Sequence, residues 1–427
     1  MPGLPARRTA LRALTAVLTD RLPLDAALAG ELGALAEPRD RAFAHALAGA
    51  ALRRRGQIEA VLAGFIERPL PKSAAEARAI LLVLGAELLV LGGAPHAAVA
   101  TAVALAGAGR ARSFKGLVNA VGRRIAERRD ELLEGADIAR LCTPDWLWSR
   151  WSAAYGEGTA RAIAEAHLEP PPLDITPRRP DDPLAFAEGA ELLPTGSVRL
   201  ARPGPVPSLP GFSEGIWWVQ DAAAALPARL LGPRPGERIL DLCAAPGGKT
   251  LQLAAAGAEV TAVDISPERL EGLAENLART GLSARIVAAD AAEFVPDEAP
   301  DRILLDAPCL ATGTIRRHPD IAWSKREADL GPLRAMQARL LEAAGRVLAP
   351  GGTLVYAVCS LEPEEGPAQI AAFLRMGGFS RVPVAPDEVP GLAEALTPEG
   401  DLRTLPCHWR ERGGLDGFFA ARLRKAP

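Results

Sequence analysis

The sequence has few cysteines, and their spacing excludes several classes of protein. Only five occur in 427 residues, at positions 142, 243, 309, 359 and 407. None forms a Cys-x-x-Cys pair and the five histidines form no short cluster, so we expect no metal site. An odd cysteine count without a secretory signal argues for reduced thiols and a cytoplasmic protein.

Long apolar segments are also missing. The first eight residues lack the apolar stretch of a signal peptide. The most apolar stretch, residues 79–94, is interrupted by Glu87 and is too short to span a bilayer. We therefore expect residues 79–94 to form a buried helix and expect no membrane partner.

Lysine is scarce, and charge is unevenly distributed. Of the 49 basic residues, 44 are arginine, and the formal net charge is −3. Residues 1–130 hold 19 basic and 11 acidic residues, a net of +8, whereas the remainder holds 30 against 41, a net of −11. Two interpretations stay open: a nucleic-acid-binding face in the first third, or a codon-composition bias toward arginine and alanine.

Residues 6–130 show helical spacing of apolar residues throughout, with breaks at prolines and glycines. This portion resembles the NusB-like RNA-binding helical domain, which implies an RNA-binding role. A generic helical bundle is the alternative. The resemblance is carried by short motifs, namely Asp40–Phe43, Leu52-Arg53, Ile80-Leu81 to Glu87, Pro95–Val99 and Gly116–Val121.

Residues 136–215 are rich in proline and include a helical stretch that carries Trp151 and Tyr155. We interpret them as a connecting subdomain with short strands and long loops. Its tryptophans can stack on bases, but core packing is the more common role and the one we favour.

From Gly215 onward, apolar strand-like runs alternate with helical segments. Ser266-Pro267 supplies an N-cap and a first-turn proline for one helix, and Gly281 ends it. The alternation predicts an α/β fold with a doubly wound, Rossmann-like sheet, and a last strand near 418–423 is expected to be antiparallel. The other expected strands are 238–242, 259–263, 284–288, 303–305 and 353–358, and the other expected helices are 250–256, 325–348 and 362–376.

A loop of small residues follows the first strand, where an open α/β sheet binds nucleotide-like ligands. It has neither Walker A nor Gly-x-Gly-x-x-Gly spacing. Asp264 ends the second strand and can accept both ribose hydroxyls, and Asp290 ends the third and can face an adenine amino group. Alone, each acid could be a surface residue or a helix cap; together they favour S-adenosylmethionine. The loop consists of Cys243, Ala244, Ala245, Pro246, Gly247, Gly248 and Lys249.

Two cysteines follow two later strands, in Asp306-Ala307-Pro308-Cys309 and Tyr356-Ala357-Val358-Cys359-Ser360. A thiolate that adds to carbon 6 of cytosine makes carbon 5 nucleophilic enough to attack a methyl sulfonium. A proton must then leave carbon 5 before the thiol is expelled. A free thiol has a pKa of about 8.5, so such a site must favour the thiolate. Cys359, at the end of an apolar strand, is suited to this role, although a lone cysteine is more often inert packing.

These motifs resemble the Sun/Fmu family of RNA (cytosine-5) methyltransferases over nearly the whole chain. The resemblance implies Cys359 as nucleophile, Cys309 as the cysteine that assists product release and Asp306 as a contact to the base. It also implies that the small-residue loop, Asp264, Asp290 and Asp306 surround the cofactor. The chain departs from the family pattern at Leu173–Arg178. The matching motifs are Asp241–Thr250, Asp306–Gly313, Tyr356–Ser360, Glu364–Gly366, Gln220-Asp221 and Asp416–Phe419.

We therefore predict a Rossmann-like methyltransferase sheet preceded by an all-α NusB-like domain. The expected domains are 1–135 (helical, RNA-binding), 136–215 (connecting) and 216–427 (methyltransferase). The expected reaction is methyl transfer to carbon 5 of a cytosine in RNA. Ribosomal 16S RNA is favoured because the NusB-like segment accompanies the ribosomal enzyme in this family. A transfer-RNA methyltransferase and a non-catalytic RNA-binding assembly factor are the alternatives.

Overall fold

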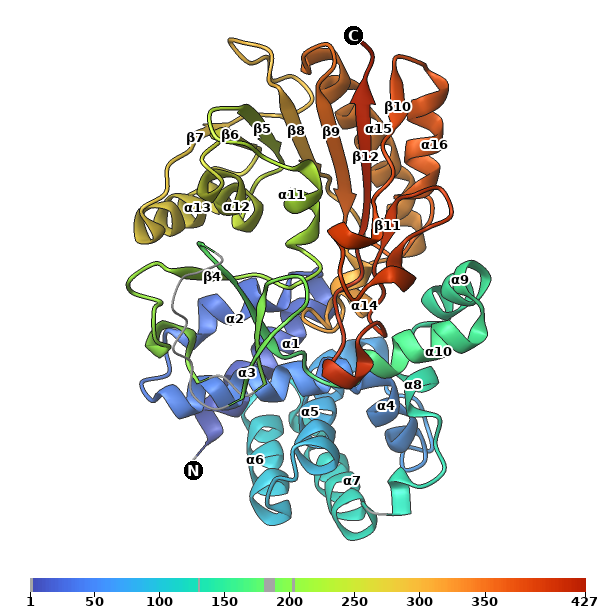
Figure 1. The fold of residues 1–427 in the computed structure, drawn as a ribbon. Coiled ribbons are helices and arrows are strands. Elements are labelled where there is room, and N and C mark those ends of the chain that lie inside the picture. The colour runs from blue at the N-terminus through green and yellow to red at the C-terminus, as the bar shows by residue number, and fades with distance from the viewer. Residues whose placement is uncertain (1–2, 130, 180–188, 202–203) are drawn as a thin grey trace. The chain divides into compact units, whose positions relative to one another are not determined.

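The computed structural model describes residues 3–129, 131–179, 189–201 and 204–427, which form two compact units (Figure 1). The first contains Met1–Pro170 together with Ile315–Glu327, and the second contains Pro171–Thr314 and Ala328–Pro427. The chain thus leaves the second unit after Thr314 and returns to it at Ala328. The division into three domains stays a prediction.

The first unit is helical across its described residues, as predicted for residues 6–130. The stretch that contains Glu87 is a buried helix, and Arg7 Nε donates to Glu87 Oε2 at 2.7 Å, which neutralises the buried carboxylate. Trp151 is 1 % exposed, so the prediction that it belongs to the core is confirmed. The helices are α1 (Leu4–Asp20), α2 (Leu24–Leu32), α3 (Pro38–Arg53), α4 (Arg55–Ala63), α5 (Ala75–Gly85), α6 (Pro95–Ala108), α7 (Lys115–Arg128), α8 (Ile138–Leu141), α9 (Asp145–Tyr155), α10 (Glu157–Ala166) and α14 (Ile321–Ser324).

The segment 315–327, which carries α14, is built into this helical unit. Trp323 Nε1 donates to the backbone oxygen of Leu52 at 2.8 Å. Arg53 Nη1 donates to the backbone oxygen of Arg316 at 2.8 Å, and the Arg316 side chain is buried. Residues about 270 positions apart in sequence therefore satisfy each other's polar groups, and the segment is part of the first unit's core.

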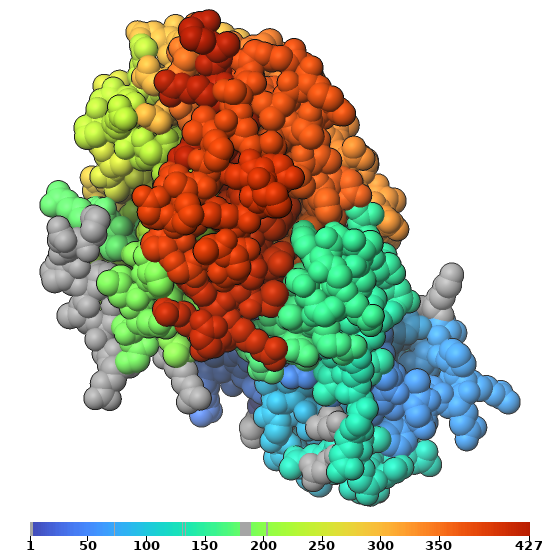
Figure 2. Space-filling model, turned by 45° about the vertical axis from the view of Figure 1, so that its right-hand side comes forward, coloured from blue at the N-terminus to red at the C-terminus, as the bar shows by residue number. Residues whose placement is uncertain are grey.

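The second unit is built on a large sheet with the strand order β10-β12-β9-β8-β5-β6-β7, and β11 pairs with β12. The strands from β9 to β7 are parallel, whereas β12 is antiparallel to β9, as predicted. The orange and red C-terminal residues form one continuous face of this unit in Figure 2. The strands are β5 (Arg238–Leu242), β6 (Glu259–Asp264), β7 (Arg285–Ala288), β8 (Arg302–Asp306), β9 (Thr353–Val358), β10 (Phe379–Arg381), β11 (Leu402–Arg403) and β12 (Phe419–Lys425).

Helices cover both faces of this sheet because alternate strand residues point to opposite sides. Leu304 and Val355 pack in one core with α11, whereas Leu305 and Tyr356 pack in another with α15 and α16. This is the doubly wound arrangement that the sequence predicted. The helices are α11 (Leu226–Leu231), α12 (Gly248–Ala255), α13 (Pro267–Thr280), α15 (Leu330–Val347) and α16 (Pro367–Arg375).

Two predicted helices begin later than expected. The helix expected from 325 begins at Leu330, because Pro332 fits only the first turn of a helix. The helix expected from 362 begins at Pro367, and residues 362–366 form a loop instead. In both helices, the proline in the first turn is a local signal for the helix start. The loop before the second helix, residues 362–366, contains two buried glutamates.

A small antiparallel sheet, in the order β2-β3-β1-β4, completes the second unit. Its first strand lies where the chain departs from the family pattern, at Leu173–Arg178. Its strands are β1 (Leu173–Pro177), β2 (Ala190–Leu192), β3 (Val198–Leu200) and β4 (Trp217–Val219).

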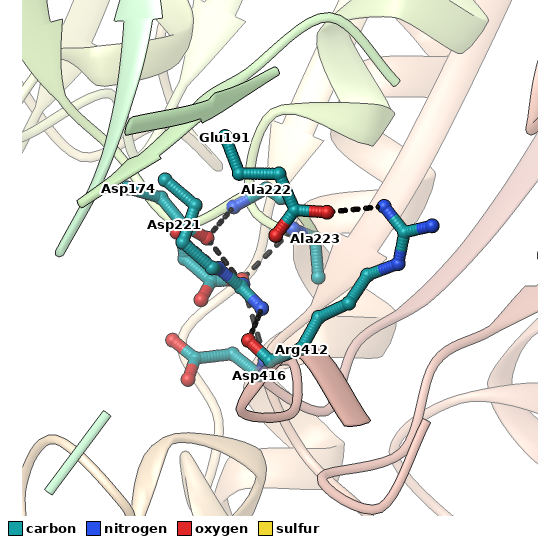
Figure 3. Close-up of polar contacts among 8 residues, drawn as sticks. Asp174, Glu191, Asp221, Ala222, Ala223, Arg412 and Asp416 are labelled. Atoms are coloured by element: carbon teal, nitrogen blue, oxygen red, sulfur yellow. Dashed lines mark hydrogen bonds and ion pairs between the residues drawn. The ribbon is translucent and has the colours of Figure 1, made fainter. Parts of the chain in front are cut away.

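A buried ion pair attaches this small sheet to its surroundings (Figure 3). Arg199 donates from Nε and Nη2 to the two carboxylate oxygens of Asp174, each at 2.7 Å. Asp174 also accepts from the backbone N–H of Ala222, and Arg199 donates to the backbone oxygen of Arg412. Asp174 is therefore a structural anchor between β1, β3 and the body of the unit.

Candidate active site

Three sequence motifs meet at the carboxyl ends of neighbouring parallel strands. The small-residue loop follows β5, Asp306 ends β8, and Cys359 follows β9. Strands β5 and β8 are paired, and the chain order reverses between them. Ligands of open α/β sheets bind at this kind of switch point, so the predicted residues lie where the fold can use them.

The two motif cysteines are adjacent in space. Cys309 Sγ and Cys359 Sγ are 3.5 Å apart, although 50 residues separate them in sequence. The hydrogen bond to Cys359, together with burial, raises the pKa of the Cys309 thiol well above its ordinary value. The raised pKa favours the protonated Cys309 thiol, and either sulfur can be the donor in this contact. Both side chains are partly exposed and neither is in a disulfide.

Lys249 and Asp306 form an ion pair beside the cysteines. Lys249 Nζ donates to Asp306 Oδ2 at 2.7 Å and lies 5.2 Å from the centre of the Phe418 ring. Burial alone would lower the pKa of Lys249, but the charge and hydrogen bond of Asp306, together with other nearby acidic groups, raise it, so the ammonium stays charged. The sequence placed Lys249 only in the cofactor loop, and its position beside Asp306 was not foreseen.

The shape of the small-residue loop depends on a glycine turn and on the side chain of Asp264. Gly247 has φ +104°, and a Cβ there would collide with Leu273, so the turn requires glycine. Asp264 is buried, and its carboxylate accepts the backbone N–H groups of Ala245 and Ser266, each at 3.0 Å. Burial raises the pKa of Cys243, which keeps that third thiol protonated.

Asp241, in β5 two residues before this loop, offers an acceptor to a ligand. Thr250 Oγ1 donates to Asp241 Oδ2 at 2.6 Å, but Oδ1 has no hydrogen-bond partner among the described residues. Burial raises the pKa of Asp241 to about 7. Buried polar atoms seldom lack a partner, so an orphaned oxygen beside a close-approach loop fits a cofactor with hydrogen-bond donors.

Asp290 already has partners in the structure. Its carboxylate accepts the backbone N–H of Ala292 at 2.9 Å and pairs with Arg339 at 2.6 Å. It lies after β7 at the same edge of the sheet as Asp264. The role of Asp290 toward an adenine amino group stays a prediction, as do the roles of the other site residues.

A buried polar cluster around Cys309 was missed by the sequence interpretation. It consists of Glu362 and Glu365, from the loop after β9, and Gln337 from α15, all buried. The Glu364–Gly366 motif had been noticed only as part of the family resemblance. A useful signal would have been two glutamates directly after a buried strand, because buried carboxylates need partners.

Two further kinds of functional feature are absent from the part of the chain that the structure describes. They contain no group of three or more His, Cys, Asp or Glu side chains arranged to hold a metal ion. No described helix is both long and apolar enough to cross a membrane.

Comparison with known proteins identifies the family. The profile described as "16S rRNA methyltransferase RsmB/F" matches residues 228–424, and the NusB family profile matches residues 4–127. The chain is 39 % identical over 406 residues to ribosomal RNA small subunit methyltransferase B of Enterobacter sp. (strain 638), covering 91 % of each chain. It is 40 % identical over 406 residues to the protein of that name from Klebsiella pneumoniae, covering 91 % and 90 %.

Solved structures agree with the fold. The crystal structure of PH0851 covers 100 % of this chain and 99 % of its own with a TM-score of 0.75 at 24 % identity. A methyltransferase homologue from Pyrococcus horikoshii covers 69 % of this chain and 98 % of its own, with a TM-score of 0.54 at 29 % identity. The predicted fold class and S-adenosylmethionine as cofactor are confirmed. The chain belongs to the RsmB/F family and is an S-adenosylmethionine-dependent RNA methyltransferase.

Proposed function

We propose that this chain methylates carbon 5 of a cytosine in 16S ribosomal RNA, with Cys359 as the nucleophile. The observation that carries the proposal is the pair of sulfurs 3.5 Å apart at the ends of β8 and β9. The names of the relatives, small subunit methyltransferase B, support ribosomal RNA as the substrate. The proposal includes a cytoplasmic location, because the mechanism needs reduced thiols.

In this proposal, Cys359 adds as a thiolate to carbon 6 of cytosine, which makes carbon 5 nucleophilic. Bound S-adenosylmethionine supplies the electrophilic methyl group. Carbon 5 then loses its proton to water, the double bond between carbons 5 and 6 re-forms, and the bond from carbon 6 to sulfur breaks. The electron pair returns to the Cys359 sulfur, to which Cys309 donates a hydrogen bond. Asp306, paired with Lys249, contacts the base.

The residues proposed to hold the cofactor line the carboxyl ends of β5, β6 and β7. Asp264 accepts from the ribose hydroxyls and Asp290 faces the adenine amino group. The small-residue loop from Cys243 to Lys249 allows close approach. The orphaned Oδ1 of Asp241 supports a donor group of the cofactor nearby.

The test is covalent trapping. RNA that contains 5-fluorocytosine at the target cannot lose a proton from carbon 5, so the cysteine bond to carbon 6 persists. The wild type and the Cys309→Ala variant should form a denaturation-resistant adduct, and Cys359→Ala should not while RNA binding stays near normal. An adduct that persists in Cys359→Ala but vanishes in Cys309→Ala would reverse the two roles.

We further propose that residues 1–135 recruit RNA. Three arginines, Arg8, Arg12 and Arg110, border one hollow of the helical unit, and the first 130 residues carry a net charge of +8. The match to the NusB family supports this role. Phosphate contacts of this kind supply affinity without sequence specificity.

A further inference from the structure

Two loops at the active site are joined by buried hydrogen bonds. The first, here called the Cys309 loop, is residues 307–314 after β8. The second, the glutamate loop, is residues 359–366 after β9. Glu362 and Glu365 in the glutamate loop are both fully buried. Their side-chain carboxylates accept from Leu310 and Thr312 in the Cys309 loop, and also from Gln337 in α15 and Ser360 in the glutamate loop.

Glu365 and Gln337 hold the backbone on both sides of Cys309. The backbone N–H of Leu310 donates to the two carboxylate oxygens of Glu365, at 3.1 and 3.2 Å. Gln337 Nε2 donates to the backbone oxygen of Pro308 at 2.8 Å and to Glu365 Oε1 at 2.8 Å. The residues before and after Cys309 are thus tied to one carboxylate–amide pair.

Residues of α16 and β9 hold the Glu365–Gln337 pair in place through further hydrogen bonds. Gln369 Nε2 donates to Gln337 Oε1 at 3.0 Å, and the Tyr356 hydroxyl donates to the backbone oxygen of Glu365 at 2.6 Å. The side chains of Gln337, Tyr356 and Glu365 are fully buried. Their rotamers are therefore set by packing and hydrogen bonds, as a positioning role requires.

Glu362 secures the far end of the Cys309 loop. Its carboxylate accepts from the hydroxyls of Thr312 and, at 2.8 Å, Ser360. Thr312 Oγ1 in turn accepts the backbone N–H of Leu361 at 3.0 Å, and Gly313 N–H donates to the backbone oxygen of Cys359 at 3.0 Å. The backbones that carry the two cysteines are therefore locked together.

Stability alone does not explain a carboxylate at position 365. Burial raises the pKa of the Glu365 carboxyl group and so disfavours its charged form. Among the described residues, no cation pairs with it, and burying an unpaired charge is costly. Its oxygens accept N–H donors from Leu310 and Gln337, and a carboxylate can accept at both oxygens. The hydrogen bonds by which Glu365 holds the loop of Cys309 account for a carboxylate that is buried at this cost.

We propose that Glu365 and Gln337 are positioning residues that hold Cys309 against Cys359 for the release step. The proposal rests on the function proposed above. In that step carbon 5 gives its proton to water, the bond from carbon 6 to sulfur breaks, and the electron pair returns to Cys359. Cys309 stabilises this leaving sulfur only while its S–H points at it from the observed 3.5 Å. Displacement of the Cys309 loop therefore slows release and leaves the attack by Cys359 intact.

The experiment separates attack from release on cytosine RNA. Adduct formation is timed in a single turnover, and decay of the methylated adduct is timed after a chase. Displacement by about 1 Å can cost about 100-fold, so Glu365→Gln and Gln337→Met should slow release at least about tenfold. Adduct formation should change less than about threefold, so the variants should accumulate adduct. Leu340→Ala is the control, since it weakens the same hydrophobic core but removes no hydrogen bond to the Cys309 loop.

A double-variant test decides whether the effect passes through Cys309. In a Cys309→Ala background, Glu365→Gln should slow release no further, because residues that act as one unit are not additive. Further slowing in that background would overturn the proposal. The proposal would also be overturned if the variants slowed attack and release equally. It would be overturned as well if both positioning variants showed the same rates of attack and release as Leu340→Ala. If Glu365→Gln does not fold, Gln337→Met carries the same test.

The two proposals fail in different ways. If wild-type protein forms no adduct, or Cys359→Ala forms one, the proposed nucleophile is wrong. If wild-type protein forms and releases the adduct and both positioning variants release it at the wild-type rate, only the positioning role is wrong.

Discussion

At the residue scale, the acids at the strand ends serve the protein backbone as well as any ligand. Asp264 already accepts two backbone N–H groups, from Ala245 and Ser266. Each carboxylate oxygen keeps a second lone pair, so these bonds leave room for ribose hydroxyls. One side chain can thus shape the loop and contact the cofactor.

Asp264→Ala should weaken S-adenosylmethionine binding. Hydrogen bonds to a charged group are worth about 1.5–3 kcal/mol, which corresponds to a loss of roughly 10- to 100-fold. Titration calorimetry on the full chain measures it. Glu268→Ala is the control, because Glu268 is an exposed residue in the first turn of α13. Unchanged affinity in Asp264→Ala would remove this residue from the cofactor site.

At the element scale, the small sheet depends on one buried ion pair. Asp174 and Arg199 are almost completely buried, whereas Glu191 and Arg412, which form a second pair, are partly exposed. Removing one partner of a buried pair leaves an uncompensated charge, whereas an exposed pair contributes little. The two pairs lie close together and form a natural comparison.

Asp174→Ala should destabilise the chain by about 3–5 kcal/mol, because Arg199 would stay buried without its carboxylate. Glu191→Ala should cost less than about 1 kcal/mol. Urea unfolding followed by fluorescence measures both. Replacing both Asp174 and Arg199 with leucine should recover much of the loss. A small effect of Asp174→Ala would show that the sheet does not need this anchor.

At the scale of the whole molecule, segment 315–327 restricts how RNA recruitment can be tested. A chain that starts near Ala136 would lose Leu52 and Arg53, the partners of Trp323 and Arg316. We still expect such a chain to bind S-adenosylmethionine, to bind RNA more weakly and to show a shallower salt dependence. Point substitutions in the full chain are the cleaner test, because they leave the segment packed.

Arg8→Gln combined with Arg110→Gln should weaken RNA binding and make its salt dependence shallower. Both residues are exposed and border the same hollow of the helical unit. Each lost phosphate contact should reduce the slope of log K against log salt by about 1. Arg285→Gln, on the second unit, is the matched control. An unchanged slope in the double variant would favour the codon-bias explanation of the basic excess.

Local signals in the sequence were enough to predict most of the elements and the chemistry they carry. Strands β5, β6 and β9 and helix α13 were predicted because apolar runs, Ser266-Pro267 and Gly281 are local signals. The methyltransferase chemistry was predicted because Cys309 and Cys359 each follow a strand, in short motifs that resemble those of the RNA (cytosine-5) methyltransferases. The start of α15 was misplaced because the helical pattern continues past the true boundary at Leu330.

Which of these residues come into contact depends on long-range packing in the folded chain. Three contacts of the site join residues that are 50 to 57 positions apart in sequence. They are the Cys309–Cys359 contact, the Lys249–Asp306 ion pair and the hydrogen bond from Leu310 to Glu365. Each depends on β5, β8 and β9 lying side by side, and sheet order leaves no local mark in a sequence. The same holds for segment 315–327, which follows a strand of the second unit yet packs in the first. Arg316 is buried and Trp323 is partly buried among these helices, and burial is a property of the folded chain.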